Sequence, residues 1–397
     1  MTFYESDNTD FEKNYYKKML ALIGSLSNLF SSSERPYLAS RVTENVFCKY
    51  LDAENLSRSD ITADARKGHT GIGIKTWVGS NLQKIAEFNS QKPMYENLKT
   101  EEMVKYVSQL RNDRILFTMR TYDLNKMVYH CTIRDKGIIK VAECPLELID
   151  IDKINSIKKN RNIITFNDRK NNYSFNTSKS TLYKDFKNIQ ILDTVKVKII
   201  EDPFLLLEQR ILNSKDGEIV FAGELQKEKE HVFLPLYTFT KERGKYVQEK
   251  AALNARFSGG RKRDIYEAYI AISKEFNRKF RPFFPPSDQP FKLILPNGKE
   301  LSAKICQQGD KALMTNPNKD LGHWLIDDVF KIDPQELITY EMLEKYGIDS
   351  VRITKEDDLV YSIDFAKIGS YEAFMDSSEI DSTGIVDNAG SDGTLDS

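Results

Sequence analysis

Residues 60–89 read Asp-Ile-Thr-Ala-Asp-Ala-Arg-Lys-Gly-His-Thr-Gly-Ile-Gly-Ile-Lys-Thr-Trp-Val-Gly-Ser-Asn-Leu-Gln-Lys-Ile-Ala-Glu-Phe-Asn, and the N-terminal half is organised around this stretch. The apolar run 71–77 predicts a short strand with Lys75 near its end. Ser80 or Asn81, both good N-caps, begins a predicted helix whose apolar residues recur at spacings of three and four. We therefore expect a strand, a loop and an amphipathic helix in this order.

Polar side chains around this strand are placed to form a metal site. Asp64 precedes the strand, Lys75 ends it, and Glu87 lies on the predicted helix, with Gln83 one turn before it. Carboxylate oxygens are the ligands that Mg²⁺ prefers, and a lysine beside them would contact the metal-bound water or a scissile phosphate. Glu44, on an earlier predicted helix, is a further candidate, although an exposed helix glutamate is the alternative for this residue.

The spacing from Asp64 to Lys75 resembles the core of the PD-(D/E)XK nucleases. The chain departs from that family at Gly73, where the family usually has an acid. The resemblance implies that Glu87 supplies the missing carboxylate, that Asp64 and Glu87 hold Mg²⁺, and that Lys75 and Gln83 belong to the same site. With Glu44 added from its helix position, the catalytic candidates are Asp64, Lys75, Glu87, Gln83 and Glu44. The alternative is a lysine at a strand end paired with a surface glutamate. A phospholipase-D site is excluded, because its histidine and lysine lie two residues apart.

Charge is distributed unevenly along the 397 residues, although the formal net charge is only −1. The segment from Glu372 to the end has seven acids and no Lys or Arg. The window 153–187 has nine bases against two acids, and the window 241–281 has twelve against five. Basic windows of this kind suit a polyanion such as DNA, and the alternative is a solvated, lysine-rich surface.

Composition narrows the class of protein. The chain is 40% hydrophobic and 29% charged, as in an ordinary globular protein, and it contains no apolar run long enough to span a membrane. Its N-terminus has no apolar region typical of a signal peptide. The cysteines lack paired spacing, which favours reduced thiols and a cytoplasmic location.

The rest of the N-terminal half predicts a mixture of helices and strands. The periodicity favours helices over 10–30 and 37–51 and near residue 182, and strands over 114–121, 126–133, 138–143, 163–166, 173–175 and 190–200. These elements indicate an α/β domain over residues 1–200, followed by a linker over 201–231.

The C-terminal half is dominated by short strands. Phe291–Leu295 and residues 301–307 flank Pro-Asn-Gly-Lys, which predicts a hairpin with an Asn-Gly turn. Further strands are expected over 232–239, 266–272, 350–354 and 359–365, and helices over 322–330 and 340–346. Many short strands with few helices suggest a small barrel. The Ser/Asp/Gly-rich residues 371–397 are expected to be disordered.

Several separated blocks in this half resemble, in order, the C-terminal DNA-recognition domain of NgoFVII-type restriction endonucleases. The blocks begin at Glu249, Gly260, Phe291 and Ala303. The resemblance implies a B3-like pseudobarrel over 232–370 and two arms, near 241–263 and 307–320, that enter the major groove of double-stranded DNA. The fold class expected for the whole chain is therefore α+β, with an N-terminal α/β PD-(D/E)XK-like nuclease core and a C-terminal B3-like β pseudobarrel.

The side chains of the two arms supply the candidate DNA contacts. Arg, Asn and Gln can make bidentate contacts with guanine and adenine edges, whereas Lys more often contacts phosphate. The candidates for base contacts are Asn254, Arg256, Arg261, Arg263, Gln307, Gln308, Asn316 and Asn318. The candidates for phosphate contacts are Lys245, Lys250, Lys311 and Lys319.

Three hypotheses for function follow. The first is a type II restriction endonuclease with a cognate DNA methyltransferase in the same system; a homodimer is expected because cutting both strands usually needs two active sites. The second is a sequence-specific DNA-binding protein whose N-terminal domain is degenerate or serves as a dimerisation unit, and Gly73 in place of an acid favours it. The third is a restriction subunit that needs a separate ATPase, because the chain has no phosphate-binding Gly-x-x-x-x-Gly-Lys-Ser/Thr loop.

Overall fold

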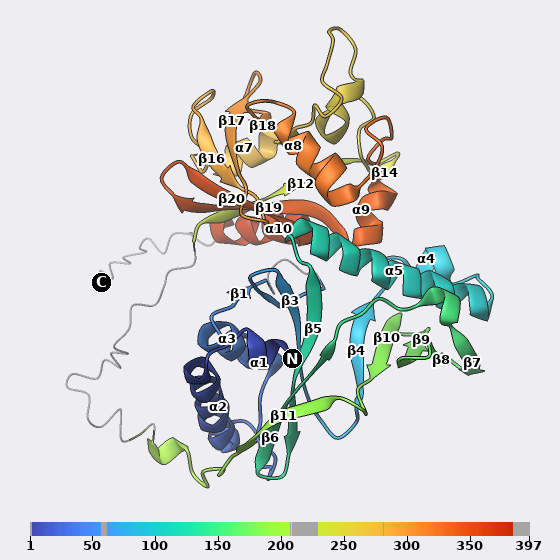
Figure 1. The fold of residues 1–397 in the computed structure, drawn as a ribbon. Helices are drawn as coiled ribbons and strands as arrows, with labels where there is room; N and C mark the ends of the chain where they lie inside the picture. The colour runs from blue at the N-terminus through green and yellow to red at the C-terminus, as the bar shows by residue number, and fades with distance from the viewer. Residues whose placement is uncertain (1, 57–61, 207, 209–228, 281, 384–397) are drawn as a thin grey trace, which may run out of the picture.

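The structure is a computed structural model that describes residues 2–56, 62–206, 208, 229–280 and 282–383. For residues 378–383 it describes the backbone alone. The chain forms an N-terminal unit, from α1 to β11, and a C-terminal unit, from β12 to α10 (Figure 1). Asp60, most of the predicted linker and residues 384–397 of the predicted tail lie outside the described residues.

Helices occur in both units, and those of the C-terminal unit other than α10 have seven residues or fewer. They are α1 (Phe3–Ser6), α2 (Asp10–Ser25), η1 (Ser27–Leu29), α3 (Ser40–Tyr50), α4 (Lys92–Tyr95), α5 (Thr100–Thr121), η2 (Ile151–Lys153), η3 (Ala252–Phe257), α7 (Lys274–Phe280), α8 (Asp320–His323), the π-helix η4 (Trp324–Phe330), α9 (Tyr340–Tyr346) and α10 (Ser370–Thr383).

The strands form three main sheets and one small ribbon. They are β1 (Glu54–Asn55), β2 (Ala65–Lys67), β3 (Thr70–Val78), β4 (Leu82–Glu87), β5 (Lys126–Asp135), β6 (Ile138–Pro145), β7 (Asn155–Asn160), β8 (Ile163–Asn167), β9 (Asn172–Asn176), β10 (Thr181–Asp185), β11 (Gln190–Lys196), β12 (His231–Pro235), β13 (Thr238–Thr240), β14 (Gly244–Tyr246), β15 (Ile270–Ala271), β16 (Phe291–Ile294), β17 (Glu300–Cys306), β18 (Ala312–Thr315), β19 (Ile348–Asp357) and β20 (Val360–Lys367).

The main N-terminal sheet has the order β1-β2-β3-β5-β6-β11. The strands β2 and β3 form an antiparallel hairpin, and β3 pairs in parallel with β5. Parallel neighbours need a crossover, and the chain makes it through β4 and α5. The expected helices over 10–30 and 37–51 are confirmed as α2 and α3, which pack on one face of this sheet.

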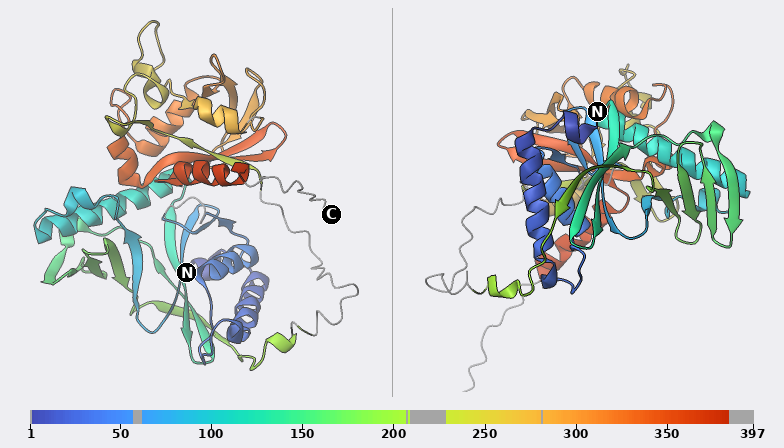
Figure 2. Two further views of the ribbon diagram at one scale, coloured as in Figure 1. Left: turned by 180° about the vertical axis from the view of Figure 1, so that it is seen from behind. Right: turned by 60° about the horizontal axis from the view of Figure 1, so that its bottom comes forward.

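A second N-terminal sheet has the order β4-β10-β9-β8-β7. It lies on the far side of the main sheet from α1, α2 and α3 (Figure 2). Its buried face is apolar and packs against α5 through side chains that include Ile164, Phe175 and Leu182. The short helix expected near residue 182 is wrong, because this segment is β10, which is paired on both sides by β9 and β4.

The helix expected after Ser80 is also wrong, because residues 82–87 form β4. The antiparallel pairing of β4 with β10 runs from Thr181 opposite Glu87 to Asp185 opposite Leu82, with one bulge. The bulge lets the consecutive residues Ile85 and Ala86 both contact the core against α5, which produced the apparent helical spacing. Leu82, the first residue of that spacing, is exposed instead.

The strand expected over 114–121 is the last part of the 22-residue helix α5. This segment contributes to two cores, because Ile115 packs under the main sheet while Phe117 joins the core of the C-terminal unit. A helix with apolar contacts on several sides lacks a single hydrophobic face, which explains why the pattern in the sequence resembled a strand. In Figure 1, α5 lies between the C-terminal unit and the second sheet.

The C-terminal unit contains a seven-stranded sheet of order β12-β19-β20-β16-β17-β18-β15. Its terminal strands β12 and β15 contact each other, so the sheet is nearly closed and barrel-like, as expected. The predicted hairpin is confirmed as β16 and β17, with Gly298 of its turn at a φ of +84°. The interior is apolar and includes the fully buried Trp324.

The two units meet along α5 and its ends. Phe117 stacks on Tyr346 with ring centroids 4.6 Å apart. The hydroxyl of Tyr122 donates to Asp364 at 2.5 Å, and Arg120 Nε donates to the carbonyl of Val329 at 2.7 Å. These contacts combine an aromatic core with oriented polar bonds, so they fix the position of the C-terminal unit over α5.

Three other expectations can be compared with the structure. Residues 370–383 form helix α10, so the prediction of disorder is wrong for this part of the predicted tail. The four cysteines are free thiols, as expected. Within the described parts of the chain, no helix has the length and apolarity needed to cross a membrane.

Candidate active site and DNA-recognition surface

Asp64 and Lys75 are brought together by the β2–β3 hairpin. Asp64 lies one residue before β2 and opposite Gly73, because Ala65 pairs with Ile72. Its backbone N–H donates to the carbonyl of Ile72 at 2.8 Å, and its side chain accepts from the backbone N–H of Ile74 at 2.6 Å. These bonds hold the Asp64 carboxylate beside the strand that carries Lys75.

Gly73 has a steric explanation. A Cβ atom at this position would lie 3.1 Å from the ring of Tyr129 and 3.2 Å from Leu146. An acidic side chain would therefore meet the buried side chains of Tyr129 and Leu146, and the chain has no room for the acid that the family usually has here.

The environment of Asp64 disfavours its charged form. Burial raises the pKa of the Asp64 carboxyl, while the nearby Lys75 and the hydrogen bond from Ile74 oppose this rise. Glu44 also raises the pKa, so its carboxylate lies within electrostatic range of Asp64. A cation bound beside Asp64, in addition to Lys75, would offset the repulsion between the carboxylates of Asp64 and Glu44.

A cavity of about 580 Å³ opens beside these residues, between the two units. Asp64, Lys75 and Glu87 all line it, so three members of the predicted catalytic set share one pocket. Its other walls come from α5, including Arg111 and Arg114, and from the C-terminal unit around Gly347 and Lys367.

The pocket is electropositive. Five cationic residues line it, against the two acids Asp64 and Glu87; they are Lys75, Lys84, Arg111, Arg114 and Lys367. An excess of positive charge in a concave site attracts a phosphate group. The sequence analysis did not select Lys84, Arg111, Arg114 or Lys367, because their segments were assigned to other elements or lie far from the motif in the chain.

Glu87 and Gln83 take different positions on β4. The Glu87 carboxylate accepts from Lys84 at 2.7 Å and from Asn89 at 2.6 Å, at the rim of the pocket. Arg114 donates to the backbone carbonyl of Glu87 at 2.8 Å, which fixes the end of β4. Gln83 instead donates to the carbonyl of Ser80 and is not among the residues that line the pocket.

Glu44 belongs to α3 and pairs with Arg41 at 3.2 Å. It is not among the residues that line the pocket, and its link with the site is the electrostatic effect on Asp64. Among the described residues, the trio whose ligand atoms lie within 4.8 Å of one another is His323, Asp327 and Asp328, on α8 and η4. The acids near Lys75 therefore do not form a preassembled cluster of three ligands.

The first predicted arm, residues 241–263, is held by internal bonds. Arg256 donates to the backbone carbonyls of Pro334 and Leu253, both at 2.8 Å. Arg261 and Arg263 both pair with Glu267, which is buried. In this conformation the three guanidinium groups stabilise the arm itself.

The lysines of the first arm differ in their surroundings. Although burial opposes it, bonds to the carboxylates of Asp349 and Glu372 raise the pKa of Lys245 above its ordinary value. Lys250 is exposed. Lys245 is therefore held inside the unit, whereas Lys250 faces solvent.

The second predicted arm, residues 307–320, is more accessible. Exposed candidates on it are Gln307, Gln308, Lys311, Asn316 and Lys319, while Asn318 is partly buried. Amide side chains that are open to solvent can bind base edges without first breaking a bond inside the protein. The structure therefore presents the second arm, more than the first, as a surface ready for DNA.

Asn254 is buried and bridges η3 to the segment before α9. Its Nδ2 donates to the carbonyls of Gln248 and Ile338, and its Oδ1 accepts from the backbone N–H of Ile338 at 2.9 Å. We expect Asn254→Ala to lower the free energy of unfolding by about 1–3 kcal/mol, because it leaves buried backbone groups unpaired. Urea unfolding measures this loss, and the exposed Gln308→Ala variant, which should unfold like the wild type, is its control. Equal midpoints for both variants would contradict this structural role.

Comparison with known families bears on the C-terminal unit. Residues 229–357 match the model of the NgoFVII C-terminal B3-like DNA-binding domain. The match starts just before β12 and ends with β19, so it covers most of the nearly closed sheet. A search of curated proteins gave no match. The C-terminal unit is thus similar to the DNA-binding domain of a restriction endonuclease, which supports DNA binding and suggests a type II restriction enzyme.

Proposed function

We propose that this chain is a type II restriction endonuclease that makes site-specific, Mg²⁺-dependent double-strand cuts in DNA as part of a restriction-modification system. One observation carries the proposal: the pocket that joins Asp64, Lys75 and Glu87 lies directly against the unit that is similar to a DNA-binding domain. This function requires that DNA bound by that unit extends to this pocket.

The hairpin arrangement supports a nuclease site. Asp64 and Lys75 come from neighbouring strands and line the same pocket, which agrees with the resemblance to the PD-(D/E)XK core. The cations of α5 and of Lys84 add positive charge where a scissile phosphate would lie. Positive groups fixed before the reaction stabilise the charge that develops on a phosphate in the transition state.

The donor set fits Mg²⁺. This ion takes hard oxygen ligands, keeps several waters and is often held by only one or two carboxylates together with substrate phosphates. Asp64 and Glu87 would hold the ion, with Glu44 near enough to add negative charge. The bound ion would supply a reactive water and neutralise charge on the phosphate. The absence of three preassembled ligands is compatible with a site completed by DNA.

Each protein group then has a defined task. Lys75, partly buried on β3, orients the attacking water or offsets charge on the phosphate. Arg114 keeps the end of β4, and with it Glu87, at the rim of the pocket. Arg111 donates to Tyr129, which packs where a side chain on Gly73 would lie.

Cutting both strands usually needs two active sites, so we propose that the enzyme acts as a homodimer. A methyltransferase with the same specificity would protect the host DNA. A second candidate function, a DNA-binding protein or a restriction subunit that needs a separate ATPase, is favoured by one observation: the buried side chains around Gly73 exclude the usual acid.

Incubation of the full-length protein with unmethylated phage DNA, in Mg²⁺ and in EDTA, tests the proposal. We expect discrete fragments in Mg²⁺ and intact DNA in EDTA, because the carboxylates need the ion to act. Fragments in EDTA would contradict the metal site at Asp64 and Glu87. Intact DNA in both, with a shifted band on a native gel, would favour the second candidate function.

A further inference from the structure

The second N-terminal sheet ends in a row of residues that begins beside the pocket. The register aligns Glu87, Thr181, Asn176, Ile163 and Asn160 across all five strands, from β4 to β7. Glu87 lines the pocket, and the carbonyl of Ser180 accepts from the backbone N–H of Phe88 next to it. This end of the sheet is therefore continuous with the pocket wall.

Four cations gather at this end. Lys158 and Lys159 lie on β7, Arg161 lies in the turn between β7 and β8, and Lys179 lies in the turn between β9 and β10. All four are exposed. Within the part of the chain that the structure describes, none of them forms an ion pair, and the one acid in the row, Glu87, is bonded to Lys84. We call these four residues the sheet-end patch.

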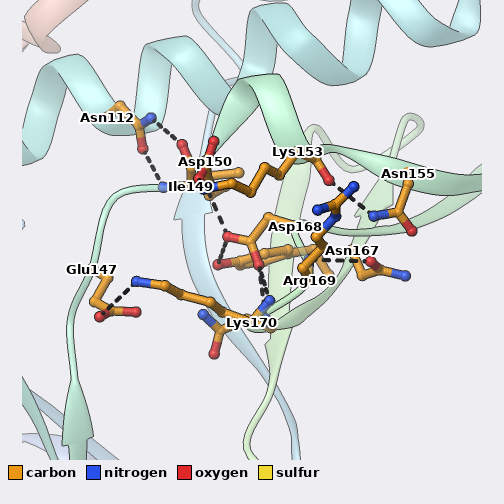
Figure 3. Close-up of polar contacts among 12 residues, drawn as sticks. Asn112, Glu147, Ile149, Asp150, Lys153, Asn155, Asn167, Asp168, Arg169 and Lys170 are labelled. Atoms are coloured by element: carbon orange, nitrogen blue, oxygen red, sulfur yellow. Dashed lines mark hydrogen bonds and ion pairs between the residues drawn. The ribbon is translucent and has the colours of Figure 1, made fainter.

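At the opposite end of the same sheet, two of the cations are paired with acids. Lys153 pairs with Asp150 at 2.5 Å, and Lys170 pairs with Glu147 at 3.3 Å (Figure 3). Arg169 and Lys187 also lie at that end and are exposed without an ion pair among the described residues. The sheet-end patch differs in that all four of its cations are unpaired in the described part of the chain and in that its end of the sheet adjoins the pocket.

Asp168, one of the two acids in the window 153–187, offsets none of the charge at the sheet-end patch. It is fully buried. Its carboxylate accepts from the backbone N–H groups of Asn171 at 2.7 Å, Lys170 at 3.1 Å and Asp150 at 3.3 Å (Figure 3). These bonds shape the β8–β9 turn and tie it to η2, so Asp168 has a structural role away from the surface.

The dimensions suit a DNA backbone. Four inter-strand steps of about 4.8 Å separate β4 from β7, so the row extends about 19 Å from the pocket wall. One DNA strand carries a phosphate every ~3.4 Å of helix axis, so about five or six phosphates of one strand span this length. Lys179 lies between β9 and β10 and the other three cations lie on β7 or in the β7–β8 turn, so the patch covers the part of this row away from β4 and can contact several phosphates there.

We propose that the sheet-end patch binds the DNA phosphate backbone on one side of the scissile phosphate, independently of base sequence. This inference rests on the proposed function, because it places the DNA cleavage site in the pocket. In this proposal the second sheet holds the duplex beside the cleavage site, while the C-terminal unit selects the DNA sequence.

The salt dependence of DNA binding tests the proposal. Two proteins are compared, and both carry Lys75→Ala so that neither can cut DNA. One keeps the sheet-end patch, and the other has Gln in place of Lys158, Lys159, Arg161 and Lys179. The binding of a random-sequence duplex is measured for each. Each phosphate contact adds ~0.9 to the slope of log K against log salt, so we expect the slope to fall by about 2–4. Each single substitution should lower the slope by about 1.

A charge-matched control uses four exposed lysines from α2, the β5–β6 turn, β11 and the residues just after it: Lys18, Lys136, Lys196 and Lys198. None of these lines the pocket. Changing all four to Gln removes the same charge and should leave the slope within about 1 of the wild type. An unchanged slope in the patch variant, or an equal fall in the control, would overturn the proposal.

The outcomes also separate this proposal from the proposed function. Binding of a random duplex requires no cleavage, so the salt slope reports on the patch even if the protein proves not to be a nuclease. A protein that cuts DNA but shows the same slope in the patch variant would keep the nuclease function and lose the patch.

Discussion

Replacement of Asp64 by Asn, or of Lys75 by Ala, is expected to lower the rate of DNA cleavage by at least about 100-fold while leaving the Kd for DNA within about twofold. Asp64 is the most enclosed carboxylate of the pocket, and Lys75 is the cation on the adjoining strand. Both act on the reacting phosphate, whereas affinity comes mainly from the many contacts along the duplex. Initial rates on phage DNA and filter binding measure the two quantities.

Matched controls exist elsewhere in the same unit. Asp193→Asn and Lys196→Ala make the same chemical changes on β11, where Asp193 pairs with Lys17. Both control variants should cut DNA at a rate within about twofold of the wild type, because surface ion pairs contribute little to stability. Wild-type cleavage by Asp64→Asn would sink the assignment of this carboxylate, and loss of binding in Lys75→Ala would contradict the division of tasks between the two units.

Stability measurements distinguish lost chemistry from lost folding. The pKa of Asp64 is higher in the folded protein than the ordinary value, so the charged carboxylate destabilises the fold at neutral pH. This penalty disappears as the pH falls through the folded pKa towards about 3.8. Asn carries no charge and can still accept the bond from Ile74, so Asp64→Asn should unfold at pH 7 no more easily than the wild type.

Gly322→Ala is expected to destabilise the C-terminal unit by about 3 kcal/mol or more. A Cβ atom at this position would lie 1.7 Å from the backbone carbonyl oxygen of Tyr266 and 3.2 Å from the Cβ of Ala268. Gly322 belongs to α8, and the opposing backbone leads into β15, so neither side can give way as a flexible side chain would. Relief of the clash requires a shift of helix or strand within a close-packed core.

Urea unfolding followed by tryptophan fluorescence measures this effect, because the buried Trp324 lies directly after α8. Gly259→Ala is the control: nothing lies within 4 Å of the added Cβ, and its backbone needs no positive φ. It should shift stability by less than about 0.5 kcal/mol. Equal midpoints for the two variants would show that α8 can move away from Tyr266 at little cost.

Part of the candidate site could be predicted because its signals are local. The strand that carries Lys75 follows from an apolar run of strand length, and Asp64 precedes it at a fixed spacing. Lys75 does not end this strand, because β3 continues to Val78. The Asn-Gly turn at residues 297–298 likewise determines its own hairpin. The resemblance of the C-terminal half is supported by the family match over 229–357.

The lining of the pocket could not be predicted in the same way. Glu87 reaches the pocket from an edge strand held by β10, about 100 residues later, and the sequence alone favoured a helix there. Arg111 and Arg114 were not selected because the apolar residues of α5 do not form a single face, since this helix contributes side chains to several hydrophobic cores. Asn254 and Arg256 have residue types suited to bases, yet they bond backbone groups about 80 residues later in the chain. Arg261 and Arg263 pair instead with the nearby Glu267, which the sequence analysis did not consider as their partner.

The sequence by itself determined the elements whose stability comes from neighbours in the chain: the helices α2 and α3, the strand β3 with its lysine, and the hairpin of β16 and β17. Only the tertiary structure decided that residues 82–87 are a strand and that the acid, the lysine and the cations of α5 share one cavity. The physical reason is that hydrogen bonds between distant strands and burial against a distant helix outweigh local preferences of a few tenths of a kcal/mol per residue.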